Sequence, residues 1–176
     1  AHGAGVPVEE ARTKVKLPAK GEWQVYARTF NWTSPWHDGE GPGRFRIAVQ
    51  GQELPETLGD EGSRWEWQYA GSFNAASKEI DLSLKDLTGF DGRCDAILFT
   101  REEKAPAYAS AKDMESLRKR LIKDYGKVHD AGGYDVVVAG GGVAGMCAAV
   151  SAARLGLKVA LIHNRPVLGG NNSAEI

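Results

Sequence analysis

Cysteine is scarce in this chain, and its scarcity excludes several kinds of site. Two cysteines, Cys94 and Cys147, occur among 176 residues and lie far apart in the sequence. Without a C-x-x-C pair, neither a zinc ribbon nor a thioredoxin-like redox centre is predicted. We expect Cys147 to be a small buried hydrophobe rather than a reactive thiol, because free cysteine usually packs in this way. Thiol–disulfide chemistry is therefore disfavoured.

An excess of one charge and a long apolar run are also missing. Lysine and arginine together number 22 and aspartate and glutamate 23, which gives a formal net charge of −1. Because there is no basic excess, no nucleic-acid partner is predicted. No apolar stretch is long enough to cross a bilayer, so no membrane partner is predicted either. The length of the chain allows one large domain or two small ones.

The front part of the sequence alternates apolar and polar residues with a period of two, and polar turns separate the alternating stretches. Several short strands of this kind predict an antiparallel β-sandwich, which we assign to residues 1–107. We expect Trp65, Trp67 and Tyr69, which share one strand face, to lie in its core. The pattern resembles the galactose-binding-like jelly roll of carbohydrate-binding modules.

Two features of this front part admit more than one interpretation. Trp32 and Trp36 lie in a loop rich in glycine and proline. Their indoles either pack beneath the loop, stack on a glycan or dock onto the following domain. Asp86, Asp91 and Asp95 cluster in the sequence but lack the spacing of an EF-hand loop. Turn formation is favoured over calcium binding for these acids, and no metal site is predicted.

Residues 108–133 form a predicted helical linker between two domains. Within it, Met114, Leu117, Leu121 and Tyr125 lie on one stripe of a helix over residues 111–125. Acidic side chains near the start of this stretch and basic side chains further on suit the helix dipole. Acids are interspersed with the basic residues, which indicates a solvated helix face.

The last part of the sequence, residues 134–176, carries the strongest motif. Tyr134 to Ala139 is a short β-branched run typical of a buried parallel strand. It leads directly into GGGVAG, residues 140–145, which fits the pattern G-x-G-x-x-G. A helical pattern follows and ends at Gly156, and Lys158 to Ile162 forms a second strand. Strand, glycine loop, helix and strand in this order predict a β-α-β unit that binds a dinucleotide rather than an ordinary glycine-rich turn.

The positions of the glycine loop have different physical tasks. Gly140 allows a tight turn out of the strand, and Gly142 allows the backbone to approach a pyrophosphate closely. Gly145 allows the helix to pack against the strands. The N–H groups of Val143 and Ala144, at the positive end of the helix, are expected to face the phosphates.

The sequence after the second strand favours a flavin over a nicotinamide. RPVLGGNNS, residues 165–173, places Gly169 and Gly170 where FAD enzymes of the glutathione-reductase and fumarate-reductase type have a Gly-Gly. On these residues the chain resembles the FAD-dependent oxidoreductase family, whose cofactor is FAD. One branch is especially similar. It joins the flavin domain to an N-terminal β-domain, and some of its members are named xanthan lyase.

One position departs from the pattern of the family. Where a ribose-binding acid is expected, this chain has His163, followed by Asn164. Either side chain could hydrogen-bond a ribose hydroxyl, although without the strength of a carboxylate. The alternative is that His163 merely ends the strand at the surface.

The resemblance implies an FAD-dependent oxidoreductase of which this chain is an internal fragment, since one β-α-β unit cannot bury both faces of a parallel sheet by itself. The fragment is expected to be inactive, because resembling enzymes close the flavin site with later segments. The expected partner is a small-molecule substrate, with a carbohydrate-related compound as one option. The sequence identifies neither a catalytic acid or base nor an oligomeric state. A carbohydrate-binding module with a structural Rossmann-like end stays open, and Gly169-Gly170 disfavours an NAD-dependent dehydrogenase. Resembling proteins are often exported, which favours the periplasm or secretion over the cytoplasm.

Overall fold

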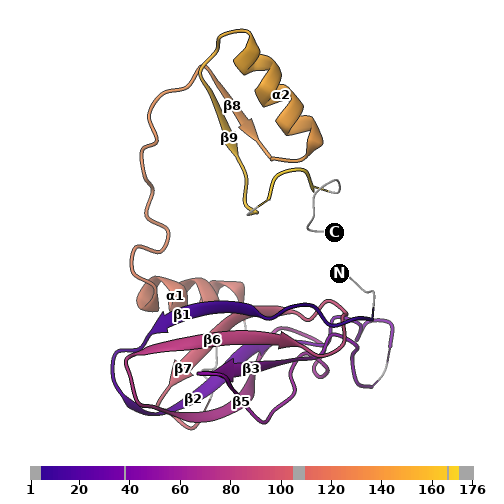
Figure 1. The fold of residues 1–176 in the computed structure, drawn as a ribbon, viewed down its shortest axis with the longest axis vertical. Coiled ribbons are helices and arrows are strands. Elements are labelled where there is room, and N and C mark those ends of the chain that lie inside the picture. Colours follow the sequence, from indigo (N-terminus) through magenta and orange to yellow (C-terminus); the bar gives the residue numbers. More distant parts are fainter. Residues whose placement is uncertain (1–4, 38, 105–109, 166, 171–176) are drawn as a thin grey trace. The chain divides into compact units, whose positions relative to one another are not determined.

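The structure is a computed structural model that describes residues 5–37, 39–104, 110–165 and 167–170. The chain divides into two compact units, Ala1–Tyr125 and Gly126–Ile176, and each is described by itself. Strands β1 to β7 and helix α1 belong to the first unit, and β8, α2 and β9 belong to the second (Figure 1). The boundary between the units falls within the stretch predicted as a linker.

Two antiparallel sheets form the first unit, with the strand orders β1-β6-β3-β4 and β5-β2-β7. The strands are β1 (Ala11–Lys16), β2 (Gly21–Thr29), β3 (Phe45–Val49), β4 (Gln52–Glu53), β5 (Glu66–Ala75), β6 (Glu79–Asp86) and β7 (Cys94–Thr100). The pairings within both sheets are antiparallel. The predicted β-sandwich is therefore confirmed as two antiparallel sheets, while its galactose-binding-like topology stays a prediction.

One hydrophobic core lies between the two sheets. Successive side chains of a strand point to opposite faces, so every second residue of β2, β3 and β6 turns toward this core. The predicted period of two thus corresponds to the packed faces of these strands. The buried members of the core are Leu17, Trp23, Val25, Ala27, Phe45, Ile47, Val49, Leu54, Leu58, Ala70, Ala75, Ile80 and Leu82.

The prediction that Trp65, Trp67 and Tyr69 line the core is wrong. Ala70 is fully buried, whereas its neighbour Tyr69 is 42% exposed. The register between β2 and β5 shifts at this point, because Ala70 is an extra residue on β5. This bulge reverses the alternation, and Tyr69 packs on the outer face against Tyr26, with the ring centroids 5.3 Å apart.

Helix α1 (Ala111–Leu121) packs on the sandwich. A capping box begins it, in which the Ser110 side chain accepts a hydrogen bond from the Asp113 backbone and the Asp113 side chain accepts one from Ser110. Met114 and Leu117 are buried, whereas Leu121, on the same predicted stripe, is 56% exposed. The apolar stripe is thus covered in the first turns and open at its end.

The carboxylate of Asp95 connects this helix to the sheet. Asp95 of β7 accepts hydrogen bonds from Arg28 Nη1 at 2.8 Å and from Arg118 Nη2 of α1 at 2.7 Å. Arg28 is only 8% exposed, and its guanidinium lies 5.2 Å from the ring centroid of Trp65. Because a buried cation is costly without a paired anion, Asp95 stabilises the buried Arg28 guanidinium.

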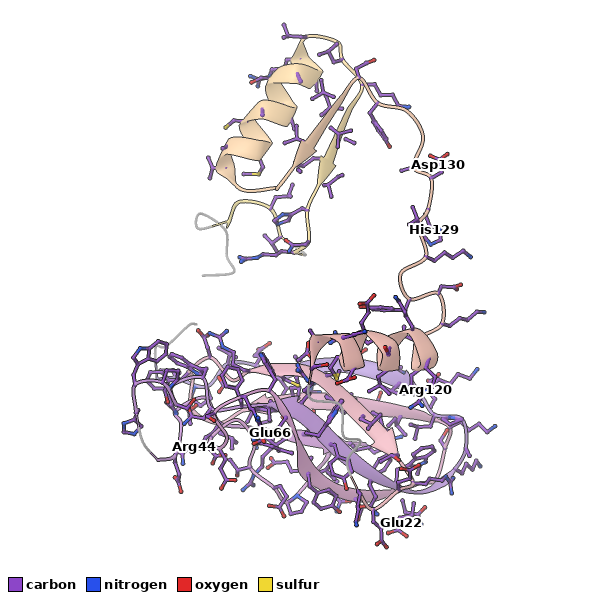
Figure 2. All side chains as sticks on the ribbon, turned by 180° about the vertical axis from the view of Figure 1, so that it is seen from behind. Glu22, Arg44, Glu66, Arg120, His129 and Asp130 are labelled. Carbon is purple, nitrogen blue, oxygen red and sulfur yellow. The ribbon has the colours of Figure 1, made fainter. Side chains whose placement is uncertain are left out.

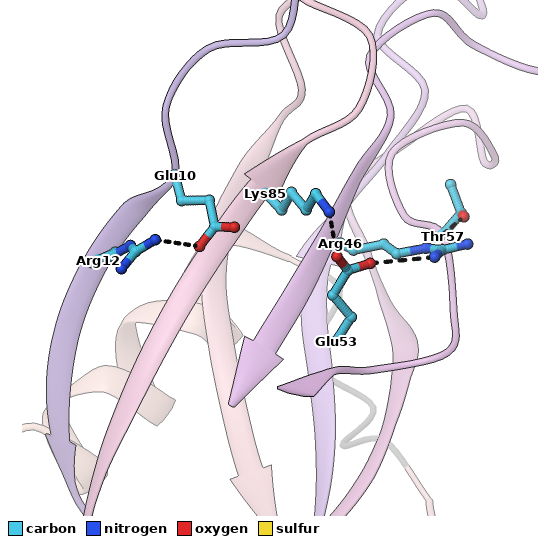
Figure 3. A network of polar contacts seen from close by, with 6 residues as sticks. All are labelled: Glu10, Arg12, Arg46, Glu53, Thr57 and Lys85. Carbon is cyan, nitrogen blue, oxygen red and sulfur yellow. Dashed lines mark hydrogen bonds and ion pairs between the residues drawn. The ribbon is translucent and has the colours of Figure 1, made fainter. Parts of the chain in front are cut away.

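Charged side chains lie on the surface of the first unit. Exposed side chains such as Glu22 and Arg44 project from it (Figure 2). On the four-stranded sheet, Glu53 pairs with Lys85 and with Arg46, whose Nη1 lies 3.4 Å from the carboxylate (Figure 3). The hydrogen bond from Lys85 lowers the pKa of Glu53. Exposed pairs of this kind add little to stability.

The predicted acid cluster is used within the fold. The Asp86 carboxylate accepts hydrogen bonds from the backbone N–H groups of Val8, Thr88 and Gly89 at 2.9–3.0 Å. It therefore holds a turn, as predicted, while Asp95 pairs with arginines. Within the ranges that the structure describes, no three His, Cys, Asp or Glu side chains gather in an arrangement suited to a metal ion.

The second unit is a β-α-β unit, as predicted. Strands β8 (Val136–Ala139) and β9 (Val159–Ile162) pair in parallel, and helix α2 (Val143–Arg154) connects them. Val137 is 56% exposed and Tyr134 38%, so the expectation that Tyr134 to Ala139 forms a buried strand is wrong for these residues. One helix covers a single face of a two-stranded sheet. In the described part of the chain, neither helix is long and apolar enough to span a membrane.

We expect Asp95→Ala to destabilise the first unit by about 2–3 kcal/mol, because the buried Arg28 guanidinium would lose a charged acceptor. Urea unfolding followed by tryptophan fluorescence measures the change. Asp81→Ala, which removes an exposed acid from β6, is the matched control and should change stability by less than about 0.5 kcal/mol. Equal losses in the two variants would contradict the importance of the bridge.

Candidate functional site

Two glycine segments meet at the carboxyl ends of β8 and β9. Gly140 follows β8 and donates its N–H to the carbonyl of Ile162 at 2.8 Å. Gly169 donates its N–H to the carbonyl of Gly141 at 2.8 Å, and Gly142 and Gly169 form an isolated parallel bridge. The glycine loop and the Gly-Gly loop predicted from the sequence therefore lie side by side. Ligands of open α/β sheets bind at this edge.

Gly145 is required by the packing of helix α2. A Cβ atom at this position would lie 1.8 Å from the carbonyl oxygen of Gly140 and 3.5 Å from Cγ1 of Val138. Ala149, one turn further along, is buried as well. The helix can approach the glycine loop so closely only because small residues face the strands, as the predicted packing role of Gly145 requires.

Gly142 is the N-cap of α2, and the space beside it is open. A Cβ atom at Gly142 would meet no other atom within 4 Å. In the described structure, no side chain caps this helix, and its first turn contains no acidic residue. By helix geometry, the N–H groups of Val143 and Ala144 have no partner within the helix. An uncapped helix end of this kind suits a phosphate group.

His163 lies between the two glycine segments. Its Nδ1 accepts the N–H of Gly141 at 3.0 Å, and its Nε2 lies 3.0 Å from the carbonyl oxygen of Val167. Because the backbone N–H must donate, Nδ1 carries no proton, and Nε2–H donates to Val167. Both ring nitrogens are thus bonded within the chain, while Asn164 beside it is exposed. The ribose roles of His163 and Asn164 stay predictions.

Sequence reasoning missed one residue of the site, Gly141. A Cβ atom here would lie 2.4 Å from Cδ2 of Leu168 and 2.7 Å from Cγ of His163. The motif G-x-G-x-x-G leaves this position unspecified, so only the run of three glycines signals it. Packing against the returning chain, rather than contact with a ligand, requires glycine at residue 141.

The two loop tryptophans of the sandwich lie in different environments. Trp32 is half-buried, and the guanidinium of Arg93 lies 5.6 Å from the centroid of its ring. Trp36 is 78% exposed, with its ring 6.5 Å from that of Trp32. Packing beneath the loop therefore describes Trp32 and not Trp36.

Hydrogen bonds from a buried amide hold this loop. Asn31 is 2% exposed, and its Oδ1 accepts from the N–H and the hydroxyl of Thr33 at 2.9 and 2.7 Å. Its Nδ2 donates to the carbonyl of Gly39 at 3.2 Å. The loop that presents Trp36 to solvent is thus held from within.

The cysteines differ from expectation in one respect. Cys147 is exposed on α2, so the prediction that it is buried is wrong for the described residues. It lies on a part of the helix that the two strands do not cover. Cys94 is half-buried, and burial together with the neighbouring Asp95 carboxylate raises the pKa of its thiol to about 11. A thiol of this kind is a poor nucleophile near neutral pH.

Known proteins are similar to this chain over the glycine-loop segment. The sequence profile of the family described as FAD dependent oxidoreductase matches residues 135–176. A soluble pyridine nucleotide transhydrogenase of Ectopseudomonas mendocina (strain ymp) is 60% identical over 38 residues, 22% of this chain and 8% of that protein. A dihydrolipoyl dehydrogenase of Trypanosoma brucei brucei is 60% identical over 37 residues, 21% of this chain and 8% of that protein.

These matches confirm the resemblance to FAD-dependent oxidoreductases and support FAD as the cofactor. The open backbone at Gly142 and the uncapped helix end fit its pyrophosphate. The chain spans about 8% of the length of the curated relatives it matches.

Two solved structures resemble the chain weakly. The C-terminal domain of EclA, a sugar-binding protein, has a TM-score of 0.37 and 12% identity, and covers 51% of this chain and 65% of its own. A family 35 carbohydrate binding module from an environmental isolate has a TM-score of 0.38 and 16% identity, with 61% and 81% covered. Similarity this weak does not establish a fold, so the assignment of a β-sandwich is based on the two sheets described above.

We expect Gly145→Ala to destabilise the second unit by about 1–3 kcal/mol, because the added methyl group would collide with the Gly140 carbonyl. Gly142→Ala is the matched control, since its Cβ would enter open space and its φ of −67° suits any residue. Amide hydrogen exchange in β8 and α2 measures the change. Similar protection in both variants would contradict the close approach.

Proposed function

We propose that the complete protein is an FAD-dependent oxidoreductase, and that residues 134–176 hold the adenosine diphosphate half of its FAD. The observation that carries this proposal is the meeting of two glycine segments with the uncapped N-terminus of α2 at the ends of two parallel strands. The family match over residues 135–176 supports it.

Most of the predicted residues then have a task in binding. The backbone at Gly140 and Gly142 is open to a pyrophosphate, and the N–H groups of Val143 and Ala144 donate to its oxygens. The positive end of the helix dipole stabilises the negative charge of the phosphates. Gly169 and Gly170 adopt φ values of 122° and 58°, which residues other than glycine rarely adopt. These two residues line the site beside the glycine loop.

When bound, FAD supplies hydride or electron transfer. The described residues of this chain bind and orient it. Asn164, exposed just beyond β9, offers an amide to a ribose hydroxyl. The proposed substrate is a small molecule, and the predicted exported location belongs to the same proposal.

The first experiment is a visible absorption spectrum of the complete protein, purified without added cofactor. We expect flavin bands in the wild type and their loss in Gly142→Val, because the valine side chain would occupy the space of the pyrophosphate. Gly133→Val is the matched control, since a Cβ there also meets nothing within 4 Å but lies outside the loop. A colourless wild type that takes up no added FAD would overturn the proposal.

A specific observation favours a second role, for the sandwich. We propose that the loop around Trp36 binds a sugar. The exposed indole belongs to the same loop as a hollow of about 380 Å³ lined by Thr33, His37, Glu40 and Arg44, among others. Aromatic faces stack on pyranose rings, while hydroxyl, carboxylate and guanidinium groups bond sugar hydroxyls. Because Asn31 already holds the loop, little conformational entropy is lost on binding.

We expect Trp36→Ala to weaken glycan binding at least about tenfold, since a central aromatic contact is usually worth more than 1.4 kcal/mol. A glycan array screened with the whole chain, followed by calorimetry on the best ligand, measures the loss. Tyr125→Ala, which removes an aromatic residue 39% exposed elsewhere in the same unit, is the control. Unchanged glycan binding in Trp36→Ala would contradict the sugar site and favour a docking role for the loop.

A further inference from the structure

We infer that His163 is a positioning residue that fastens the two glycine segments of the site to each other, and that it is not a ligand of ribose. The effect of His163 on cofactor binding rests on the proposed FAD site, whereas the hydrogen bonds of its ring do not depend on any cofactor. It follows from the hydrogen bonds of the ring, from the chemistry of imidazole and from the packing around Gly141.

The imidazole extends the pairing of the two parallel strands by one step. Ala139 and Ile162 are the last paired residues, and the N–H of Gly140 still bonds to the carbonyl of Ile162 at 2.8 Å. The next N–H, that of Gly141, bonds to Nδ1 of His163 at 3.0 Å instead of to a carbonyl. A side-chain nitrogen therefore takes the place of a backbone acceptor where the strand leaves the sheet.

The other side of the ring holds the returning chain. Nε2 bonds to the carbonyl of Val167 at 3.0 Å, and two residues later Gly169 donates to the carbonyl of Gly141 at 2.8 Å. Both polar groups of the Gly141 backbone are thus bonded, one to His163 and one to Gly169. Together these bonds close a ring of contacts between the two glycine segments.

Imidazole suits this task and a carboxylate does not. The bridge needs one acceptor, toward Gly141, and one donor, toward Val167, which the neutral ring provides. A carboxylate has acceptors only, so its second oxygen would face the Val167 carbonyl without a proton between them. The residue that departs from the family pattern is therefore matched to its neighbours in this chain.

The imidazole ring packs closely against the backbone of Gly141. A Cβ on Gly141 would lie 2.4 Å from Leu168 and 2.7 Å from the imidazole, so the ring lies directly on the glycine backbone. Gly169 is buried at the same place. The bridge therefore sets the distance between the glycine loop and the Gly169-Gly170 segment, which would hold the pyrophosphate.

The first test needs no cofactor and uses the whole chain. Nitrogen-15 NMR of the imidazole should show the neutral tautomer with the proton on Nε2, and the Gly141 amide should be protected from hydrogen exchange. In His163→Phe we expect Gly141 protection to fall at least about tenfold, since its hydrogen bond is lost. His163→Gln, which keeps one acceptor and one donor, should restore part of it. His129→Phe, at an exposed residue of the preceding segment, is the control (Figure 2).

The second test separates the positioning role from ribose binding in the complete flavoprotein. His163→Glu installs the acid that the family pattern expects. A positioning role predicts that FAD binds about fivefold to tenfold more weakly in this variant, because the bond to Val167 is lost. Fluorescence titration of the apoprotein with FAD measures the affinity, and circular dichroism checks that each variant is folded.

Three results would overturn the inference: a proton on Nδ1, Gly141 exchange unchanged in His163→Phe, or tighter FAD binding in His163→Glu. The last would assign the position to ribose. If the wild type binds no FAD, the proposed function fails, whereas the tautomer and the Gly141 exchange still decide the role of His163.

Discussion

The parallel register of β8 and β9 is the constraint on which the candidate site depends. Because Ala139 lies opposite Ile162, the chain leaves both strands at the same level, and Gly140 and His163 emerge side by side. The rest of the candidate site depends on this alignment of the two strand ends. The glycine loop, the N-terminus of α2 and the Gly-Gly loop are brought to one edge by two strands of four residues each.

The absence of side chains at glycine positions then decides how closely helix α2 and the imidazole approach the glycine loop. Helix α2 lies against the loop because Gly145 has no Cβ, and the imidazole lies on the loop because Gly141 has none. Gly142 differs from both, since a side chain there would meet nothing. One short motif thus combines two glycines that close packing requires with Gly142, which leaves open space for a ligand.

The sandwich shows how far periodicity alone leads. The period of two correctly indicated short strands with one face toward a core, and in β2 and β3 every second residue does face that core. It failed on β5, because the extra residue Ala70 reverses the alternation and moves Tyr69 outward. A bulge depends on the partner strand, so a pattern read along one strand does not contain it.

By itself, the sequence determined the order of elements, the antiparallel and parallel character of the two parts and the glycine loop with its cofactor class, because these follow from local periodicity and from residues adjacent in the chain. Only the tertiary structure decided what the side chains do. It brought Asp95 between two arginines, exposed Trp36 and Cys147, and set His163 between two backbone segments. Most of these partners are distant in sequence, and folding alone makes them neighbours.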